Sequence, residues 1–295
     1  DKDTITAFTM KSDRRNCDLS FSNLCSWRFL YDTQYAVIDN FLVFKFWAGE
    51  QLAYMMPVGS GDLKAILREL IEDADKEKHN FCMLGVCSNM RADLEAILPG
   101  QFTFTENRDY ADYIYLRSDL ATLKGKKFQA KRNHINRFRN TYPDYEYTPI
   151  TPDRIQECLD LEAEWCKVNN CDQQEGTGNE RRALIYALHN FEALGLTGGI
   201  LHVNGKIVAF TFGMPINHET FGVHVEKADT NIDGAYAMIN NEFANHIPEQ
   251  YIYINREEDL GLEGLRKAKL SYQPVTILEK YMACLKDHPM DIIRW

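Results

Sequence analysis

The chain has 295 residues, a hydrophobic share of 45% and a formal net charge of −10. This length and composition permit a large core and predict two domains, while the acidic balance argues against a generic binder of nucleic acid or anionic membranes. No apolar run is long enough to cross a bilayer, and residues 1–23 are too polar for a signal peptide. We therefore expect no transmembrane segment.

Eight cysteines are spread along the chain without a CxxC pair, mostly inside apolar runs. This distribution predicts reduced thiols in the core and hence a cytoplasmic protein. The sequence also contains no GxSxG or HExxH motif and no cysteine with an evident histidine partner. Neither a covalent enzyme intermediate nor a metal site is therefore predicted.

The first half begins with a mixed segment, residues 1–31, which we expect to be partly helical and to pack on another part of the chain. A β-hairpin follows, with its turn at Asp39-Asn40. The elements expected after it are a strand near Leu52–Met56, a helix from Leu63 to about Lys78, a strand over Phe81–Val86, a short helix before Pro99-Gly100, and two strands that close this half, Phe102–Phe104 and Tyr113–Leu116.

The second half repeats this order after two helices, expected over about Pro152–Val168 and Asn179–Leu194. A second hairpin turns at Asn204-Gly205. The elements expected after it are a strand over Thr220–Val225, a helix from Ala235 to Ile247, a strand over Tyr251–Asn255, a helix over Leu262–Leu270 and a strand over Val275–Leu278.

The repeated order predicts an α+β protein of two similar units, residues 1–143 and 144–295. Each unit resembles the acyl-CoA N-acyltransferase (GNAT-like) fold, a mixed and mostly antiparallel sheet flanked by helices. Two such units in one chain resemble the tandem arrangement of the Fem-type aminoacyl-tRNA-dependent transferases. The alternative is that mixed α/β chains share such an order by chance.

Three blocks carry a closer resemblance: GKKFQAKRNHINRF at Gly125–Phe138, VEKADTNIDGAYAMINNEF at Val225–Phe243, and INREEDLGLEGLRKAKLSYQP at Ile254–Pro274. They are similar to the family of the phosphatidylglycerol lysyltransferase carboxyl-terminal domain. The resemblance implies a tandem GNAT-like fold and transfer of an aminoacyl group from charged tRNA to a phospholipid headgroup. The sequence holds no counterpart of the multi-helix membrane domain of lipid-modifying relatives, so the acceptor stays open.

A basic segment at Lys124–Arg139 contains seven lysines and arginines and no carboxylate. Its aromatic and aliphatic residues fall near one face of a helix, which leaves most cations on the other faces. Such a helix can present cations to the phosphates of tRNA or a lipid headgroup, or it can be a solvated linker. The family resemblance favours a functional role for Lys131 and Arg132. We expect this helix to end the first unit.

The candidate catalytic residues are Asp259, Glu226 and Arg256, which we expect just past the carboxyl ends of two neighbouring strands. Transfer from an activated ester requires a proton acceptor and a positive group for the developing oxyanion. Asp259 and Glu226 are the candidate acids or bases, and Arg256 can orient a carboxylate or stabilise the oxyanion. The alternative is a set of structural ion pairs, such as Asp259 with Arg266.

Donor phosphates have two further candidate sites. Gly234 and Ala235 open a predicted helix, where a glycine permits close approach and backbone amides attract anions. Arg266 and Lys269 lie three residues apart on one face of the helix that follows the acidic loop.

We therefore expect an acyltransferase that requires no cofactor and uses aminoacyl-tRNA as donor, with tRNA and a phospholipid headgroup or amine as partners. One alternative is an acetyl-CoA-dependent N-acetyltransferase, although the usual pattern Q/R-x-x-G-x-G/A is absent. The other alternative is a GNAT-like module that binds a ligand without chemistry. The amino acid, the acceptor and the oligomeric state are not predicted.

Overall fold

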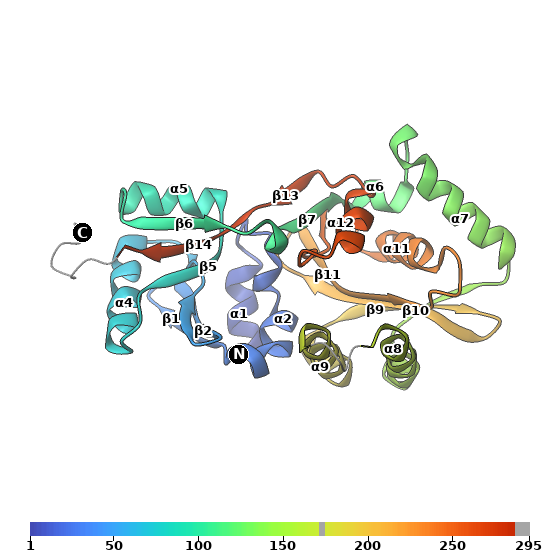
Figure 1. Cartoon of the computed structure of the whole chain (residues 1–295), viewed down its shortest axis with the longest axis horizontal. Helices are drawn as coiled ribbons and strands as arrows, with labels where there is room; N and C mark the ends of the chain where they lie inside the picture. The colour runs from blue at the N-terminus through green and yellow to red at the C-terminus, as the bar shows by residue number, and fades with distance from the viewer. Residues whose placement is uncertain (171–174, 287–295) are drawn as a thin grey trace.

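The protein consists of two mixed β-sheets with helices packed on them, as the computed structural model in Figure 1 shows. The structure describes residues 1–170 and 175–286. The predicted α+β class, with mixed sheets flanked by helices, is confirmed. Within the described part, no helix has the length and apolar character that a membrane crossing requires.

The first sheet has the strand order β1-β2-β3-β5-β14-β6, and β4 pairs with β2. Its strands are β1 (Gln34–Ile38), β2 (Phe41–Ala48), β3 (Gln51–Tyr54), β4 (Val58–Gly59), β5 (Cys82–Cys87), β6 (Phe102–Glu106) and β14 (Lys280–Leu285). Helices α4 (Leu63–Lys76) and α5 (Ser88–Ile97) share one hydrophobic cluster with this sheet. The predicted hairpin, strands and helices of this part are confirmed within a few residues.

The second sheet has the strand order β13-β7-β12-β11-β10-β9-β8. Its strands are β7 (Asp112–Leu116), β8 (Glu146–Pro149), β9 (Thr197–Val203), β10 (Lys206–Pro215), β11 (Thr220–Ala228), β12 (Tyr253–Asn255) and β13 (Thr276–Leu278). The helices that follow or precede them are α6 (Arg117–Thr122), α7 (Gln129–Thr141), α8 (Ile155–Asn169), α9 (Glu175–His189), α10 (Phe191–Leu194), α11 (Ala235–His246) and α12 (Glu263–Leu270). In Figure 1, α8 and α9 lie on one side of this sheet and α11 on the other.

Two strands pair in the sheet that is formed mainly by the other half of the chain. β7 pairs with β12 and β13 in the second sheet, so the predicted place of Tyr113–Leu116 in the first unit is wrong. β14, near the carboxyl end, inserts between β5 and β6 in the first sheet. Burial patterns specify that a segment is a strand but not which distant strand it joins. The two sheets are therefore tied together by backbone pairing.

The amino-terminal segment fills the space between the two sheets, where Figure 1 shows it in blue. It contains α1 (Lys2–Thr9), α2 (Phe21–Ser26), α3 (Arg28–Tyr31) and the short 3₁₀ turn Cys17–Leu19. Leu19 and Phe21 share one hydrophobic cluster with Phe44 of β2 and Phe212 of β10. The prediction that this segment packs on another part of the chain is confirmed.

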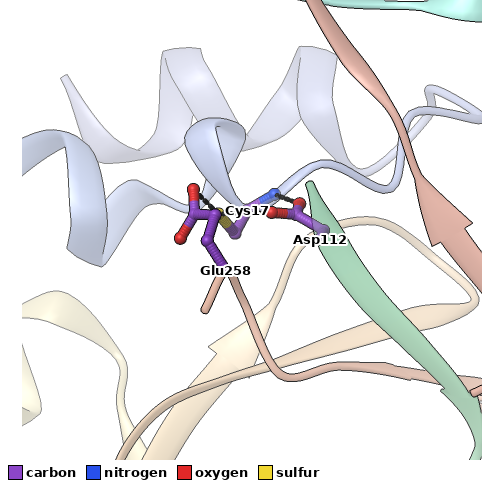
Figure 2. A group of neighbouring side chains, drawn as sticks. All are labelled: Cys17, Asp112 and Glu258. Atoms are coloured by element: carbon purple, nitrogen blue, oxygen red, sulfur yellow. Dashed lines mark hydrogen bonds between the residues drawn. The ribbon is translucent and has the colours of Figure 1, made fainter. Parts of the chain in front are cut away.

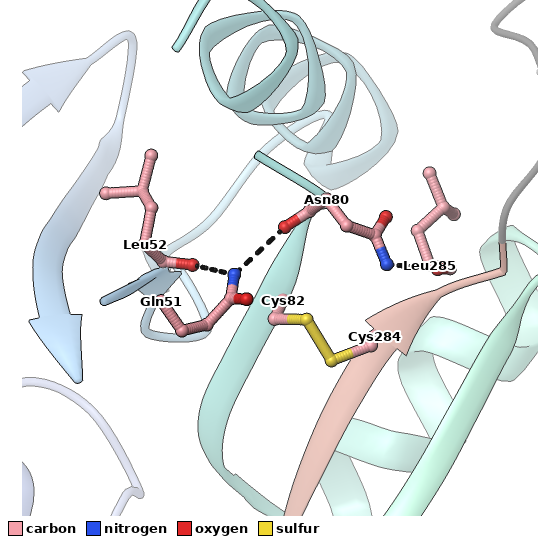
Figure 3. Close-up of a disulfide and its surroundings, with 6 residues drawn as sticks. All are labelled: Gln51, Leu52, Asn80, Cys82, Cys284 and Leu285. Atoms are coloured by element: carbon pink, nitrogen blue, oxygen red, sulfur yellow. Dashed lines mark hydrogen bonds between the residues drawn. A yellow bond between two sulfur atoms is a disulfide. The ribbon is translucent and has the colours of Figure 1, made fainter. Parts of the chain in front are cut away.

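A disulfide joins Cys82 of β5 to Cys284 of β14, residues that are 202 positions apart (Figure 3). The prediction that the cysteines are reduced thiols is therefore wrong for this pair, because strand crossing brings two distant residues face to face. Cys17, Cys87 and Cys158 are buried free thiols, as predicted. Because of this disulfide, the cysteines no longer support the predicted cytoplasmic location.

Helix α7, the predicted basic helix, packs on the second sheet. Phe128, Ile135 and Phe138 are at most 3% exposed and join a cluster with Leu201 of β9 and Met238 of α11. The predicted amphipathic arrangement is confirmed, but the packing partner of α7 is the second unit. The boundary between residues 143 and 144 stays a prediction.

Candidate active site

The loop Asn255–Asp259, which begins at the last residue of β12, is the centre of the site. Each of its five side chains contacts a different part of the chain: Asn255 donates to Asp112, Arg256 donates to Glu226, Glu257 contacts His224, Glu258 contacts Lys280, and Asp259 accepts from Arg266. β12 lies parallel to β11, so the prediction that these two strands are neighbours is confirmed. The loop is therefore fixed at every position.

Arg256 and Glu226 form a buried ion pair in this site. Arg256 Nη2 donates to Glu226 Oε1 over 3.0 Å, and the two side chains are only 12% and 13% exposed. Glu226 lies inside β11 rather than past its end, because the strand continues to Ala228. Burial alone would lower the pKa of Arg256, but the Glu226 carboxylate and nearby tyrosines raise it above its usual value. Arg256 is therefore firmly charged.

Lys131 of α7 supplies a second cation to the site. Its Nζ lies 3.9 Å from the centre of the Tyr272 ring, and the Arg256 guanidinium lies 4.9 Å from the same ring. Burial lowers the pKa of Lys131, and the neighbouring positive charge of Arg256 lowers it further. The predicted functional residues Lys131 and Arg256 thus meet at one aromatic ring, and Glu226 joins them through its ion pair with Arg256.

Two buried polar atoms here have no hydrogen-bond partner among residues 1–170 and 175–286: Arg256 Nη1 and Asn240 Oδ1. Asn240 Nδ2 donates to the second oxygen of Glu226 over 3.2 Å. Buried polar groups are usually satisfied, so unpaired ones mark places where a ligand or water supplies the partner. The site therefore offers one donor and one acceptor beside a carboxylate.

Asp259 is fully buried and its oxygens are already occupied. Arg266 donates to both oxygens over 2.8 Å, the Tyr113 hydroxyl donates over 2.5 Å, and the Gly261 amide donates over 2.9 Å. The hydrogen bonds from Arg266 hold the pKa of Asp259 far below its usual range. A carboxylate of this kind is a poor proton acceptor, so its geometry favours the structural ion pair with Arg266 over catalysis.

Three other predicted donor-binding cations hold backbone or loop structure. Arg132 donates to the carbonyls of Leu123 and Gly125. Lys269 donates to the carbonyls of Arg256 and Glu258, and Arg266 also bonds Asp109. Arg132, Arg266 and Lys269 are thus engaged in positioning the chain around the site.

Gly234 and Ala235 lie at the start of α11, but α7 covers this end. Gly234 adopts a φ of +82°, and a Cβ there would lie 3.2 Å from the His134 carbonyl oxygen and from Phe138 Cβ. Ala235 is 1% exposed and its amide donates to the Ile232 carbonyl. The glycine is needed for close packing of two helices, and this arrangement does not favour the predicted phosphate site.

A second charged cluster, which includes Glu258 of the loop, lies at the junction of the two sheets. Cys17, Asp112 and Glu258 approach one another closely enough to ligate a metal (Figure 2). However, Lys280 Nζ lies 2.7 Å from Asp112, 3.1 Å from Glu258 and 3.6 Å from the Cys17 sulfur. The ammonium thus takes the place that a metal ion would need.

A hydrogen-bonded chain links Ser20, His224 and Glu257, with both heavy-atom distances at 2.7 Å. This is the order of nucleophile, base and acid in serine hydrolases. Ser20 is 0% exposed, so no substrate carbonyl can reach it in this structure. We interpret the chain as a link between the amino-terminal segment and the loop.

Several residues of the site were not predicted from the sequence. Tyr272 and Asn240 lie inside the quoted blocks, and their spacing to the charged residues is the signal that could have found them. Asp112 and Lys280 reach the site only through the crossing strands β7 and β14. No local pattern in the sequence indicates that crossing.

The family model for the phosphatidylglycerol lysyltransferase C-terminal domain matches residues 9–284. The chain belongs to this family. A relative of this family member, an uncharacterized protein of Mycoplasmoides gallisepticum, is 26% identical over 175 residues, which are 58% of the chain and 55% of that protein. The chain thus spans about half the length of this curated relative.

Solved structures resemble the chain over nearly its whole length. A conserved protein of unknown function from Bacteroides thetaiotaomicron is 95% identical, with 97% of each chain covered and a TM-score of 0.96. The C-terminal domain of a putative lysylphosphatidylglycerol synthetase from Agrobacterium fabrum is 13% identical, with 97% and 93% covered and a TM-score of 0.71. FemX is 9% identical, with 96% and 95% covered and a TM-score of 0.64. The last two share the fold of this family member, and the predicted Fem-type arrangement is confirmed.

Proposed function

We propose that this protein transfers an aminoacyl group from charged tRNA to a hydroxyl or amine acceptor such as a phospholipid headgroup. The observation that carries the proposal is the buried Arg256 guanidinium, which keeps Nη1 unpaired among the described residues while its other side binds the Glu226 carboxylate. Membership of the lysyltransferase family supports the same class of reaction.

In the proposed reaction, the acceptor oxygen or nitrogen attacks the ester carbonyl of aminoacyl-tRNA. Glu226 accepts the proton that the acceptor loses, and Arg256 Nη1 with Lys131 stabilises the negative oxygen of the tetrahedral intermediate. The intermediate collapses as the ribose hydroxyl of tRNA leaves and takes that proton. Because aminoacyl-tRNA is already an activated ester, no covalent intermediate on the enzyme and no cofactor are required.

Helix α7 and the loop before it are the proposed contact for tRNA phosphates. Lys124, Lys126 and Arg139 are exposed, whereas Lys131 at the first turn of α7 reaches the site. Phosphate contacts of this kind supply sequence-independent affinity that falls with salt. The acetyl-CoA alternative loses its proposed pyrophosphate site, because α7 covers Gly234.

Equilibrium titration with bulk aminoacylated tRNA at about 0.15 M salt tests the proposed donor. We expect saturable binding that excess coenzyme A does not displace. Replacing two exposed lysines, Lys124→Gln with Lys126→Gln, should weaken binding and reduce the salt slope by about 2, whereas the exposed control pair Lys76→Gln with Lys206→Gln should change neither. Displacement by coenzyme A would favour the acetyltransferase, and absence of both affinities would favour a binding module without chemistry.

A further inference from the structure

Lys280 reaches the candidate site from the opposite sheet. It is the first residue of β14, which belongs to the first sheet, and its side chain is 6% exposed. Its Nζ lies 2.7 Å from Asp112 of β7, 3.0 Å from Asp18 of the amino-terminal segment and 3.1 Å from Glu258 of the site loop. One ammonium thus joins three segments that meet where the sheets touch.

The position of Glu258 depends on this ammonium. The carboxylates of Asp18, Asp112 and Glu258 surround the Lys280 ammonium. Burial raises the pKa of Glu258 to about 7; the positive charge of Lys280 opposes this shift and the negative charge of Asp112 adds to it. Other charged and titratable groups that face Glu258 are Asp18, Glu257, Lys269, the Cys17 thiol and Tyr31. Without the ammonium, buried carboxylates would repel one another, which is strongly unfavourable in a low-dielectric interior.

Movement of Glu258 would be transmitted to Arg256. The two residues are separated by Glu257 alone, and Lys269 Nζ binds the carbonyls on both sides of it. The Arg256 side chain, which donates to Glu226, is attached to this same stretch of backbone. The loop is thus held by Lys269 on one side and by Lys280 on the other.

β14 itself is firmly placed. It pairs with β5 and β6, and the disulfide between Cys82 and Cys284 ties it to β5. The first sheet therefore fixes the position of the strand that carries Lys280.

We propose that Lys280 is a positioning residue, which holds the loop Asn255–Asp259 from the first sheet and thereby sets the direction of Arg256 in the second. One sheet thus completes the site of the other. The consequence for transfer rests on the proposed function, whereas the consequence for the loop does not.

Hydrogen–deuterium exchange of the full chain tests the positioning role directly. Lys280→Met is expected to raise the exchange rates of amides in residues 255–262 by about tenfold or more, with little change in α4 and α5, because the buried carboxylates lose their counter-charge. The matched control is Lys286→Met, which removes a lysine just beyond β14 that donates to the Gly100 carbonyl. This control should leave the loop unchanged.

Two further variants keep the test decisive if Lys280→Met does not fold. Lys280→Arg keeps the charge and should keep the loop protected. The double variant Lys280→Met with Glu258→Gln removes one charge of each sign and should recover part of the protection, which simple loss of packing would not allow. Unchanged exchange in Lys280→Met, or no recovery in the double variant, would overturn the proposal.

A transfer assay separates this proposal from the proposed function. If Lys280→Met loosens the loop and lowers kcat with little change in donor affinity, positioning of Arg256 is supported. If the loop loosens but wild-type protein transfers nothing, the positioning role stands and the proposed reaction fails. If transfer is present and Lys280→Met leaves both kcat and loop exchange unchanged, the positioning role fails alone.

Discussion

Replacement of Arg256 by methionine is expected to lower kcat of acyl transfer by about a hundredfold or more, while donor affinity changes much less. The reason is that Arg256 Nη1 is buried beside Glu226 without a hydrogen-bond partner in the described part of the chain. A preorganised donor of this kind acts on charge that develops only in the transition state. Single-turnover rates and equilibrium binding of aminoacyl-tRNA together measure the two effects.

Two variants control for the loss of an arginine. Arg256→Lys keeps the charge but not the forked geometry, so we expect partial recovery of kcat. Arg154→Met removes an arginine whose side chain is 35% exposed and pairs with Glu157 over 3.8 Å. This control should retain normal turnover. A folded Arg256→Met variant with wild-type kcat would exclude Arg256 from the mechanism.

Replacement of Asp259 by asparagine is expected to lower the free energy of unfolding by about 2–3 kcal/mol. The change removes the charge that compensates Arg266 at a fully buried position and weakens the hydrogen bonds from Tyr113 and Gly261. Urea denaturation at neutral pH measures this difference. Asp109→Asn removes a more exposed partner of the same Arg266, with a side chain 46% exposed, and should cost about 1 kcal/mol or less.

The contribution of Asp259 also depends on pH. Because its pKa in the folded protein is lowered from the usual 3.8, the stability that it supplies is present above that value and is lost as pH falls below it. The difference between wild type and Asp259→Asn should therefore shrink below about pH 4. A stable Asp259→Asn variant that loses only turnover would restore Asp259 as a catalytic residue.

The sequence located the strand that leads into the central loop and the strand that lies beside it. β-rich residues followed by five consecutive polar residues mark the end of a strand, and β11 and β12 are parallel neighbours as expected. Neighbouring strands bring Glu226 close to Arg256. The roles of Asp259, Arg266 and Gly234 were harder to predict, because a buried ion pair or helix packing requires the same residue types as a catalytic or phosphate site.

The arrangement between the sheets could not be predicted from local pattern. β14 pairs with β5 from the far end of the chain, and β7 lies between β12 and β13. These pairings depend on tertiary packing, and they alone bring Lys280 beside Asp112 and Cys82 beside Cys284. Strand propensity is shared by every such segment and does not specify the partner.

The central claim is tested most directly by a single-turnover assay, with enzyme in excess over labelled bulk aminoacyl-tRNA and with phosphatidylglycerol in mixed micelles as acceptor. The account predicts that label moves from tRNA to lipid faster than the ester hydrolyses alone, and that Glu226→Gln abolishes this transfer. If the label leaves tRNA no faster than in the enzyme-free reaction, both with this acceptor and with simple amines, the proposed transfer is contradicted.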